Sequence, residues 1–402
     1  MVIAVLFAGL GVFSLWNANA ATSFKSAEAE TGAIAQPATI VSDQAAAGGN
    51  AVKFGASTTP CNGPLTITTG GTYTGCYQST DSNKAAITVA TTQPVTINRA
   101  TIKHAGVGID HGASRANITV TNSVFTASAP SVADAEQQAV RFYQPATFVI
   151  EHNRFVDGHG VLVNGDNVAT NTFRVSYNDY IDIGRYSQPA AYPGAVHTDK
   201  VIAPGGKILW NRISNHHGRS QAEDVFGLAS TKGAAGNPIE VGHNLVNGAY
   251  PITRDGAGFT GGAFDFGDIS GAYISGFNNY AVNYTNNGFM IPTGNEIYHR
   301  SSVAVYDGIA DDGQRISSTF GNGFTTWNND GYEPSGNIGV SDSKSGHRRW
   351  NGTAWERDDF YLPVGANSNN TSLGTVDAAA EQAAINEFEQ SVVANGVTIG
   401  PQ

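Results

Sequence analysis

The sequence predicts an all-β solenoid, in which short strands stack on one another in successive coils. Eight times along the chain, a strand-like alternation of apolar and polar residues ends at an amide or carboxylate residue and then resumes. These punctuating residues recur every 24 to 35 positions, at Asn98, Asn122, Asn153, Asn178, Asn211, Asn244, Asn279 and Asp307. The segments around them lack the periodicity of a helix. Because so short a unit cannot bury an apolar face alone, the repeat indicates stacked strands.

Composition agrees with this fold class. The chain of 402 residues contains 48 Gly, and only 14% of its residues are charged, which is typical of many tight turns and few long flexible side chains. A solenoid grows by adding coils, so one elongated domain accommodates this length. We expect the punctuating residues to lie at the same corner of every coil in left-handed backbone geometry, and to form an architectural ladder of hydrogen-bonded amides.

The order of segments predicts four parts. They are a signal peptide (1–20), a low-complexity spacer or N-terminal cap (21–57), a parallel β-helix (58–335), and C-terminal loops with a capping helix (336–402). The first part is apolar, carries no charge and ends in Ala-Asn-Ala, which is typical of a secretory signal. A retained membrane anchor is the alternative, and no later segment is long and apolar enough to span a membrane.

The C-terminal helix is predicted from its caps and its apolar face. Asp377 is the expected N-cap and Gly396 the expected C-terminal stop. The apolar face consists of Ala384, Ile385, Phe388, Val392 and Val393. We expect this helix to cover the last coils and to protect their open strand edge.

Cys61 and Cys76 are the only cysteines of the chain. An exported protein with an even number of cysteines is expected to pair them. On the chain-entropy model, closing a loop of this length stabilises the fold by about 3 kcal/mol. The disulfide would fasten the first coil, where a solenoid has an exposed end.

Two segments support a family resemblance: GGTYTGCYQS, which precedes PVTI, and NRISNHHGRSQAEDVFGLASTKGAAGNPIEVGHNLV. With them, residues from about 61 to 330 resemble the right-handed parallel β-helix superfamily typified by pectate lyases, and the middle part resembles secreted bacterial β-helix proteins of little assigned function. The resemblance implies a right-handed parallel β-helix. Many members cleave or epimerise polysaccharides along the outer face of one sheet, although none of the superfamily's hydrolase or pectate lyase signatures is intact here.

The strands that follow the punctuating residues are expected to share one sheet. They cover 159–165, 195–203, 222–230, 262–268, 288–294 and 324–329. With Val196, Thr198, Phe264 and Phe266 pointing inward, alternation places His197, Asp199 and Asp265 on the outer face. Asp224 joins them if Val225 and Gly227 point inward. The result would be a stripe of His and carboxylate residues across adjacent coils.

This stripe suits chemistry on a glycan. Two carboxylates can act as acid and base or nucleophile in glycoside hydrolysis, whereas a lyase needs a base and a cation or metal beside a uronate carboxylate. The predicted catalytic residues are His197, Asp199, Lys200, Asp224, Asp265 and Arg219, with His197 or His216 as a lyase base. The predicted substrate-binding residues are Arg254, Tyr250, Trp327 and His216. Asp199, Glu223 and Asp224 could hold Ca²⁺ through oxygen ligands.

The same residues also allow a structural interpretation. Glu223 and Asp224 could cap a turn, with Arg219 in an ion pair, and the aromatic residues could pack against the loops at 185–194 and 250–260. No Cys/His metal-binding spacing, nucleotide loop or activated-serine motif is present.

The net charge of −11 argues against a nucleic-acid partner. The sequence therefore predicts a secreted or cell-surface protein that acts on polysaccharide as a lyase or glycoside hydrolase. A non-catalytic protein that binds glycan or mediates adhesion is the alternative.

Overall fold

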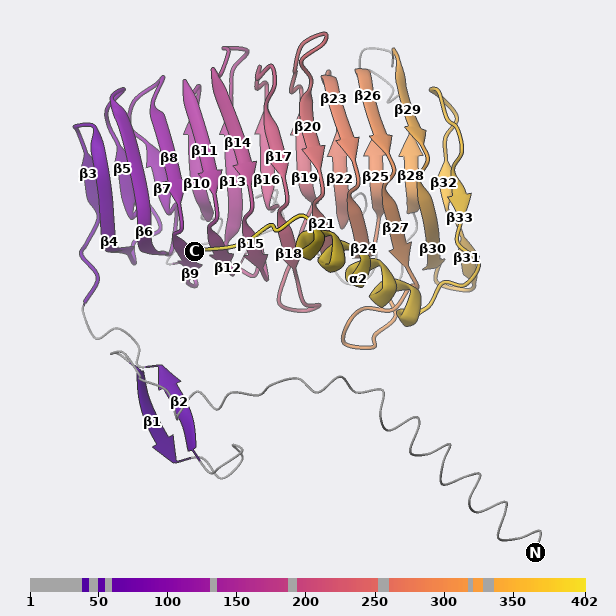
Figure 1. Cartoon of the computed structure of the whole chain (residues 1–402), viewed down its shortest axis with the longest axis horizontal. Coiled ribbons are helices and arrows are strands. Elements are labelled where there is room, and N and C mark those ends of the chain that lie inside the picture. Colours follow the sequence, from indigo (N-terminus) through magenta and orange to yellow (C-terminus); the bar gives the residue numbers. More distant parts are fainter. Residues whose placement is uncertain are drawn as a thin grey trace, which may run out of the picture. The chain divides into compact units, whose positions relative to one another are not determined.

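The computed structural model describes residues 38–42, 50–54, 60–130, 136–186, 194–251, 260–316, 321–327 and 336–402. This part of the chain is mostly β, with large parallel sheets and one helix near the C-terminus (Figure 1). The chain divides into two compact units, Met1–Pro60 and Cys61–Gln402. In the first unit, β1 (Ala38–Ser42) and β2 (Asn50–Phe54) form an antiparallel pair. The expected signal peptide lies outside the described residues.

One parallel sheet gathers eleven strands of the described chain. In spatial order these are β3 (Leu65–Ile67), β5 (Ile87–Val89), β7 (Ile109–His111), β10 (Gln138–Tyr143), β13 (His159–Asn164), β16 (Val196–Asp199), β19 (Asp224–Ala229), β22 (Gly262–Phe266), β25 (Asn287–Ile291), β28 (Asn322–Thr326) and β32 (Phe360–Tyr361). The six segments predicted to share a sheet contain β13, β16, β19, β22, β25 and β28, which are consecutive neighbours. That prediction is confirmed.

The other large sheet consists of two files of parallel strands. The first file is β8 (Asn117–Thr121), β11 (Thr147–Glu151), β14 (Thr172–Ser176), β17 (Lys207–Leu209), β20 (Ile239–Gly242), β23 (Ala272–Phe277), β26 (Asn295–Arg300) and β29 (Ile338–Ser341). The second file is β9 (Val124–Ala127), β12 (Arg154–Val156), β15 (Asp179–Ile181), β18 (Arg212–Ser214), β21 (Leu245–Ala249), β24 (Tyr280–Tyr284), β27 (Val303–Tyr306), β30 (Lys344–Trp350) and β33 (Thr371–Ser372).

At the N-terminal end of this sheet, two long strands each extend across both files. The first half of β6 (Pro94–His104) pairs with β8 and its second half with β9, and β4 (Gly71–Ser79) pairs with β6. Elsewhere the chain visits the eleven-stranded sheet, the first file and the second file in turn, as in β13, β14 and β15, and then returns to β16. This repeating path is consistent with the predicted solenoid.

The core lies on the inner faces of these sheets. Phe226, Phe264, Phe289 and Phe324 occupy matching positions on β19, β22, β25 and β28. Their buried rings stack in pairs, with centroids 4.6 to 4.8 Å apart. Because successive coils bury the same kind of side chain at the same register, their neighbours are held in matching rows on the outer face.

The predicted amide ladder exists, but only five of the eight punctuating residues form its amide steps. Asn153, Asn178, Asn211, Asn244 and Asn279 are fully buried. Each of the first four donates from Nδ2 to Oδ1 of the next, at 3.1, 3.0, 2.9 and 3.0 Å. The backbone N–H groups of the same four donate to the same oxygens. Ser123 and Ser302 continue the row at its two ends.

Asn98, Asn122 and Asp307 do not stand in this row, so their predicted place in it is wrong, although Asn122 has the predicted left-handed geometry, with φ 53°, and its Nδ2 donates to Asn98 Oδ1 at 3.2 Å. In the row itself, the predicted backbone geometry is displaced by one position. The residues immediately before the five ladder asparagines have φ between 52° and 61°; they are His152, Tyr177, Trp210, His243 and Asn278. Because the preceding residue makes the left-handed turn, each ladder Asn can point inward, as when Asn211 Nδ2 donates to the carbonyl of Val175 at 2.8 Å.

Helix α2 (Ala378–Ala394) confirms the predicted helix and its caps. The Asp377 side chain accepts a hydrogen bond from the Ala380 N–H, and Gly396 adopts φ 61°. Ala384 and Phe388 are buried, whereas Val393 is 80% exposed and was wrongly assigned to the buried face. The helix packs against β21, β24 and β27.

The helix therefore covers the flank of the second file and does not cap the last coils. The cause is an apolar outer surface on that file, formed by Leu245, Tyr280, Val282, Val303 and Val305, which packs with the helix in one cluster. After the helix, the tail runs back along the coils, and Gly400 N–H donates to Tyr177 O at 2.8 Å. Figure 1 shows α2 beside β24 and the C-terminus near β9 and β12.

The sheets also continue beyond residue 335. β29 pairs with β26, β30 with β27, β32 with β28, and β33 with β30, all in parallel. The strand-bearing region thus reaches Ser372, because the polar segment after 335 keeps the same register despite its weaker alternation. No helix in the described residues is long and apolar enough to cross a membrane.

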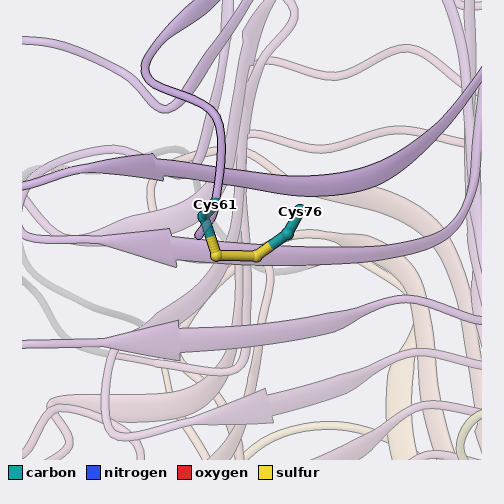
Figure 2. Close-up of a disulfide and its surroundings, with 2 residues drawn as sticks. All are labelled: Cys61 and Cys76. Atoms are coloured by element: carbon teal, nitrogen blue, oxygen red, sulfur yellow. A yellow bond between two sulfur atoms is a disulfide. The ribbon is translucent and has the colours of Figure 1, made fainter. Parts of the chain in front are cut away.

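The predicted disulfide is present (Figure 2). Cys61 and Cys76 have Cα atoms 4.6 Å apart. Cys76 lies in β4, and its neighbour Tyr77 pairs with Asn62 in an isolated bridge. The bond therefore ties the segment before β3 to the first long strand of the second unit.

Candidate functional site

A groove with a volume of about 790 Å³ crosses β10, β13, β16, β19 and β22 of the eleven-stranded sheet. Its described lining is strongly acidic and includes six carboxylate residues: Glu136, Asp199, Glu223, Asp224, Asp265 and Asp268. His159, His197 and Lys200 also line it. Five predicted catalytic residues therefore meet in one groove: His197, Asp199, Lys200, Asp224 and Asp265.

Strand register brings these residues together. His197 on β16 pairs with Gly227 on β19, which in turn pairs with Asp265 on β22. The predicted inward residues Val196, Thr198, Phe264 and Phe266 are all buried. Alternation thus confirms the outward direction of His197 and Asp265.

The condition stated for Asp224, that Val225 and Gly227 both point inward, is not met at Gly227. Val225 and Phe226 are both buried, so the alternation is interrupted at the start of β19. Phe226 takes the core position opposite Val196, and Gly227 lies beside the ring of His197. Asp224 still reaches the groove because it precedes this interruption.

Glycines on adjacent coils make room for the polar side chains. A methyl group at Gly194 would collide with Nε2 of His197 and with the carbonyl oxygen of Asp224. A methyl group at Gly262 would collide with the carboxylate of Asp224. The positions of His197 and Asp224 therefore depend on the absence of side chains from neighbouring strands.

His197 is held as a neutral imidazole. Its Nε2 lies 2.7 Å from the backbone oxygen of Asp224, and because a carbonyl can only accept, Nε2 carries the proton and Nδ1 keeps a lone pair. Burial lowers the pKa of His197. Burial, His197 and His104 together lower the pKa of His159 to about 3. The groove thus offers uncharged imidazoles beside its carboxyl groups.

The carboxyl groups at one end of the groove are unusually basic. Asp265 is only 6% exposed, and its Oδ1 has no hydrogen-bond partner among the described residues. Burial and then the charge of Asp224 raise its pKa well above the ordinary value, while burial and then Glu223 do the same for Asp224. Burial and Asp268 raise the pKa of Glu223 to about 7. Near neutral pH, protonated and ionised carboxyl groups therefore coexist there.

Asp199 and Lys200 lie on β16 and just after it, and they partner each other. Lys200 Nζ is 3.5 Å from Asp199 Oδ2, which also accepts a hydrogen bond from Asn164 Nδ2 at 3.0 Å. In the described part of the chain, no group of three or more His, Cys, Asp or Glu side chains is arranged to hold a metal ion. Calcium binding by Asp199, Glu223 and Asp224 stays a prediction.

Other predicted site residues lie elsewhere. Arg219 and His216 both contact Asp182, at 3.1 and 2.7 Å, so Arg219 does not pair with Glu223 or Asp224. The buried Tyr250 donates from its hydroxyl to Asp311 Oδ1 at 2.8 Å.

Trp327 is 38% exposed but is not part of the described groove lining. Arg254, with most of the loop around it, lies outside the described residues. Arg219 was chosen by its nearness in sequence to the stripe, but the structure places it beside Asp182, outside the described groove lining.

Sequence reasoning missed three residues of the groove, His159, Glu136 and Asp268. His159 begins a strand already assigned to the sheet, so its position was a readable signal. Asp268 lies two residues after β22, at the end of the aligned segment 262–268, and could have been found in the same way. Glu136 precedes β10, whose strand was not among the aligned segments.

Comparisons with protein-family models, with curated proteins and with solved structures found no match to this chain. The site is therefore interpreted from its own geometry. A solvent-open groove that combines neutral imidazoles with carboxyl groups in both protonation states can move protons to and from a bound substrate.

Proposed function

We propose that the unit Cys61–Gln402 is a right-handed parallel β-helix that hydrolyses the glycosidic bonds of a neutral polysaccharide. The main supporting observation is the carboxyl group of Asp265, which is buried, has no hydrogen-bond partner at Oδ1 among the described residues and lies beside other carboxyl groups in the groove. Glycoside hydrolysis requires one protonated and one ionised carboxyl group on either side of the scissile bond. The raised pKa of Asp265 supports its role as the acid.

In this proposal each nearby residue has a distinct role. Asp265 protonates the leaving oxygen, and Asp224 is the carboxylate that attacks the sugar or activates water. Glu223, with its pKa of about 7, sets the charge around Asp224 as the pH changes. His197 fixes the backbone at Asp224 through its Nε2 hydrogen bond and presents Nδ1 to the substrate.

Charge favours hydrolysis over β-elimination. A lyase must neutralise a uronate carboxylate with a cation or metal. The described lining, however, has six carboxylate residues and a single Lys or Arg side chain, that of Lys200, which already lies beside Asp199. A polyuronate would meet strong repulsion in such a groove. A neutral polysaccharide would not.

The finer fold assignment and the location follow from the sequence. The repeating path through three files of parallel strands supports a β-helix, and the resemblance to the pectate lyase-like superfamily supports its right-handed sense. The apolar residues 1–20 and the disulfide support secretion. Sequencing the N-terminus of the exported protein tests this, since cleavage after residue 20 is expected and retention of that segment would indicate an anchor.

The deciding experiment incubates the chain without residues 1–20 with neutral and uronate-containing polysaccharides, with and without calcium. We expect new reducing ends on a neutral polymer, no ultraviolet absorbance from an unsaturated product, and loss of activity in Asp265→Asn. Absorbance that rises with the reducing ends would instead mean a lyase. Glycan retained in an affinity gel without any cleavage would mean a binding protein.

A further inference from the structure

Beyond one end of the groove, an exposed aromatic side chain stands on the same sheet. Tyr143 at the end of β10 is 43% exposed. Its ring lies 4.7 Å from that of His111, at the end of β7, and the two planes are tilted by 44°. Aromatic rings that are open to solvent offer a flat apolar surface to the C–H face of a sugar ring.

Strand register links this aromatic pair to the groove. Tyr143 pairs with Asn164, and Asn164 pairs with Asp199, so the three side chains form a row across β10, β13 and β16. A parallel row, two residues earlier, runs from Arg141 through Leu162 to His197. At a strand spacing of about 4.8 Å, Tyr143 lies roughly 10 Å from Asp199 across the sheet. This distance is bridged by a short stretch of an extended glycan.

The polar groups beside Tyr143 favour an uncharged ligand. Both oxygens of Asp110 accept from the Arg141 guanidinium, at 3.1 and 2.6 Å, and Glu136 pairs with the same guanidinium. Because two carboxylates share the Arg141 guanidinium, its positive charge is already neutralised and does not attract a uronate carboxylate. Paired carboxylates and guanidinium groups instead suit the donors and acceptors of sugar hydroxyls.

The acid cluster is placed asymmetrically in the groove. Asp224 and Asp265 lie on β19 and β22, the last strands over which the groove extends, whereas the lining continues in the other direction to β10. On the side of β25 the next side chain in the row of Asp265 is Met290, which does not line the groove. More sugar units can therefore bind on the β10 side of the cleavage point than on the β25 side.

We infer that Tyr143 and His111 form a sugar-binding platform, and that a neutral glycan crosses the strands from this platform to the carboxyl groups of Asp224 and Asp265. The inference rests on the proposed function, since it extends the same groove. It assigns Tyr143 a positioning role for long substrates. Asn164 and Asp199 lie between the platform and the reacting bond.

The test compares Tyr143→Ala with Tyr361→Ala. Tyr361 is a matched control because it is 51% exposed on β32 of the same sheet, three strands beyond β22 on the side away from Tyr143. For a long neutral oligosaccharide, Tyr143→Ala should raise KM about tenfold and leave kcat unchanged. A tenfold change corresponds to about 1.4 kcal/mol, which is the size of one good aromatic contact. Tyr143→Trp should restore KM, and Tyr361→Ala should have no effect.

Substrate length provides a second readout. A short substrate that reaches only from the carboxyl groups to β16 should be cleaved equally by the wild type and Tyr143→Ala. An equal loss on short and long substrates would overturn the platform, because it would indicate a general disturbance of the sheet. An unchanged KM in Tyr143→Ala would overturn it as well.

Failure of hydrolysis is separated from failure of the platform by direct binding. Fluorescently labelled neutral oligosaccharides are titrated into Asp265→Asn and into the double variant that also carries Tyr143→Ala. Binding that weakens about tenfold in the double variant supports the platform even if the wild type cleaves nothing. Equal binding by the two proteins, or no binding to either, overturns the inference.

Discussion

Two rows of polar side chains cross the coils of this protein, and they differ in whether the members satisfy one another. In the amide ladder, Asn153 to Asn279 are buried, and the three central amides, Asn178, Asn211 and Asn244, each accept from one neighbouring amide and donate to the next. In the groove, Asp224 and Asp265 also occupy adjacent strands, but Asp265 Oδ1 has no partner in the described structure. The first row holds coils together, whereas the second is available for a ligand.

The chemical cause is the amide itself. An amide carries a donor and an acceptor, so copies of it can stack indefinitely. A carboxylate only accepts, and a second carboxylate beside it raises the pKa of both. Repetition therefore stabilises the ladder and makes the groove reactive, which leads to the following predictions.

The largest expected effect is on activity. Asp265→Asn should lower kcat on the polysaccharide by about a hundred- to ten-thousand-fold, which is the usual contribution of general acid catalysis. The melting temperature should stay equal or rise, because Asn has a similar shape and is neutral at every pH, whereas burial and the neighbouring carboxylates disfavour the ionised form of Asp265. Steady-state kinetics and thermal unfolding measure the two quantities. A protein that loses stability but keeps kcat would assign Asp265 to the structure and would contradict the contrast drawn above.

A substitution in the amide ladder should have the opposite effect, lowering stability and leaving activity unchanged. Asn211→Ala removes the acceptor of the Asn178 N–H and of Asn178 Nδ2, and it removes the side-chain donor to the Val175 carbonyl. The backbone N–H of residue 211 still donates to Asn244 Oδ1. Each unsatisfied buried group costs about 1–3 kcal/mol, so the free energy of unfolding should fall by about 3 kcal/mol or more while kcat is retained in the folded fraction. Denaturant titration measures the loss.

Asn211→Ser is the matched control for the ladder. Ser already stands at ladder positions in this chain, where Ser302 Oγ accepts from the Asn279 N–H and Ser123 Oγ accepts from the Ala100 N–H. The Ser variant should therefore be less destabilised than the Ala variant. Equal losses in both would show that the side-chain bonds do not carry the stability.

The ladder does not extend to the first coil, where the disulfide between Cys61 and Cys76 links the chain instead. The ladder position on β4 is Gly75, which lies opposite Ala100 on β6. Neither residue has a side chain that could form a hydrogen bond between coils. Replacing both Cys61 and Cys76 by Ser should destabilise this end by about 3 kcal/mol. Hydrogen exchange should quicken in β3 and β4 but not in β16 or β19. Uniformly faster exchange would mean that the coils unfold as one unit.

The smallest effect concerns pH and a buried carboxyl outside both rows. Glu381 on α2 accepts from the Asp307 N–H, and burial raises its pKa from 4.5 to about 8. Because the folded pKa lies above the unfolded one, the stabilisation is complete below about pH 4.5 and is lost as the pH rises toward 8. Thermal melts should show a decline over this range that Glu381→Gln reduces. An identical decline in that variant would assign it to the groove carboxyls, whose pKa values are also raised.

Local patterns were the reliable part of the sequence. Alternation predicted the shared sheet and the outward direction of His197 and Asp265, and capping chemistry predicted α2 from Asp377 to Gly396. Errors arose where a nonlocal choice decided the outcome. Val393 was placed on the buried face by periodicity, yet the sheet covers a narrower side of the helix and leaves it exposed.

By itself, the sequence determined the all-β class, the period of the coils, the disulfide pair and most of the groove's acidic residues, because these depend on spacing and on alternation within single strands. Tertiary structure alone decided which polar residues are satisfied. Register stacks the ladder asparagines on one another, directs Arg219 and His216 to Asp182, and leaves Asp265 Oδ1 without a partner among the described residues. Residues about 30 positions apart meet only when the coils close, and a polar atom's partner then depends on the neighbouring coil.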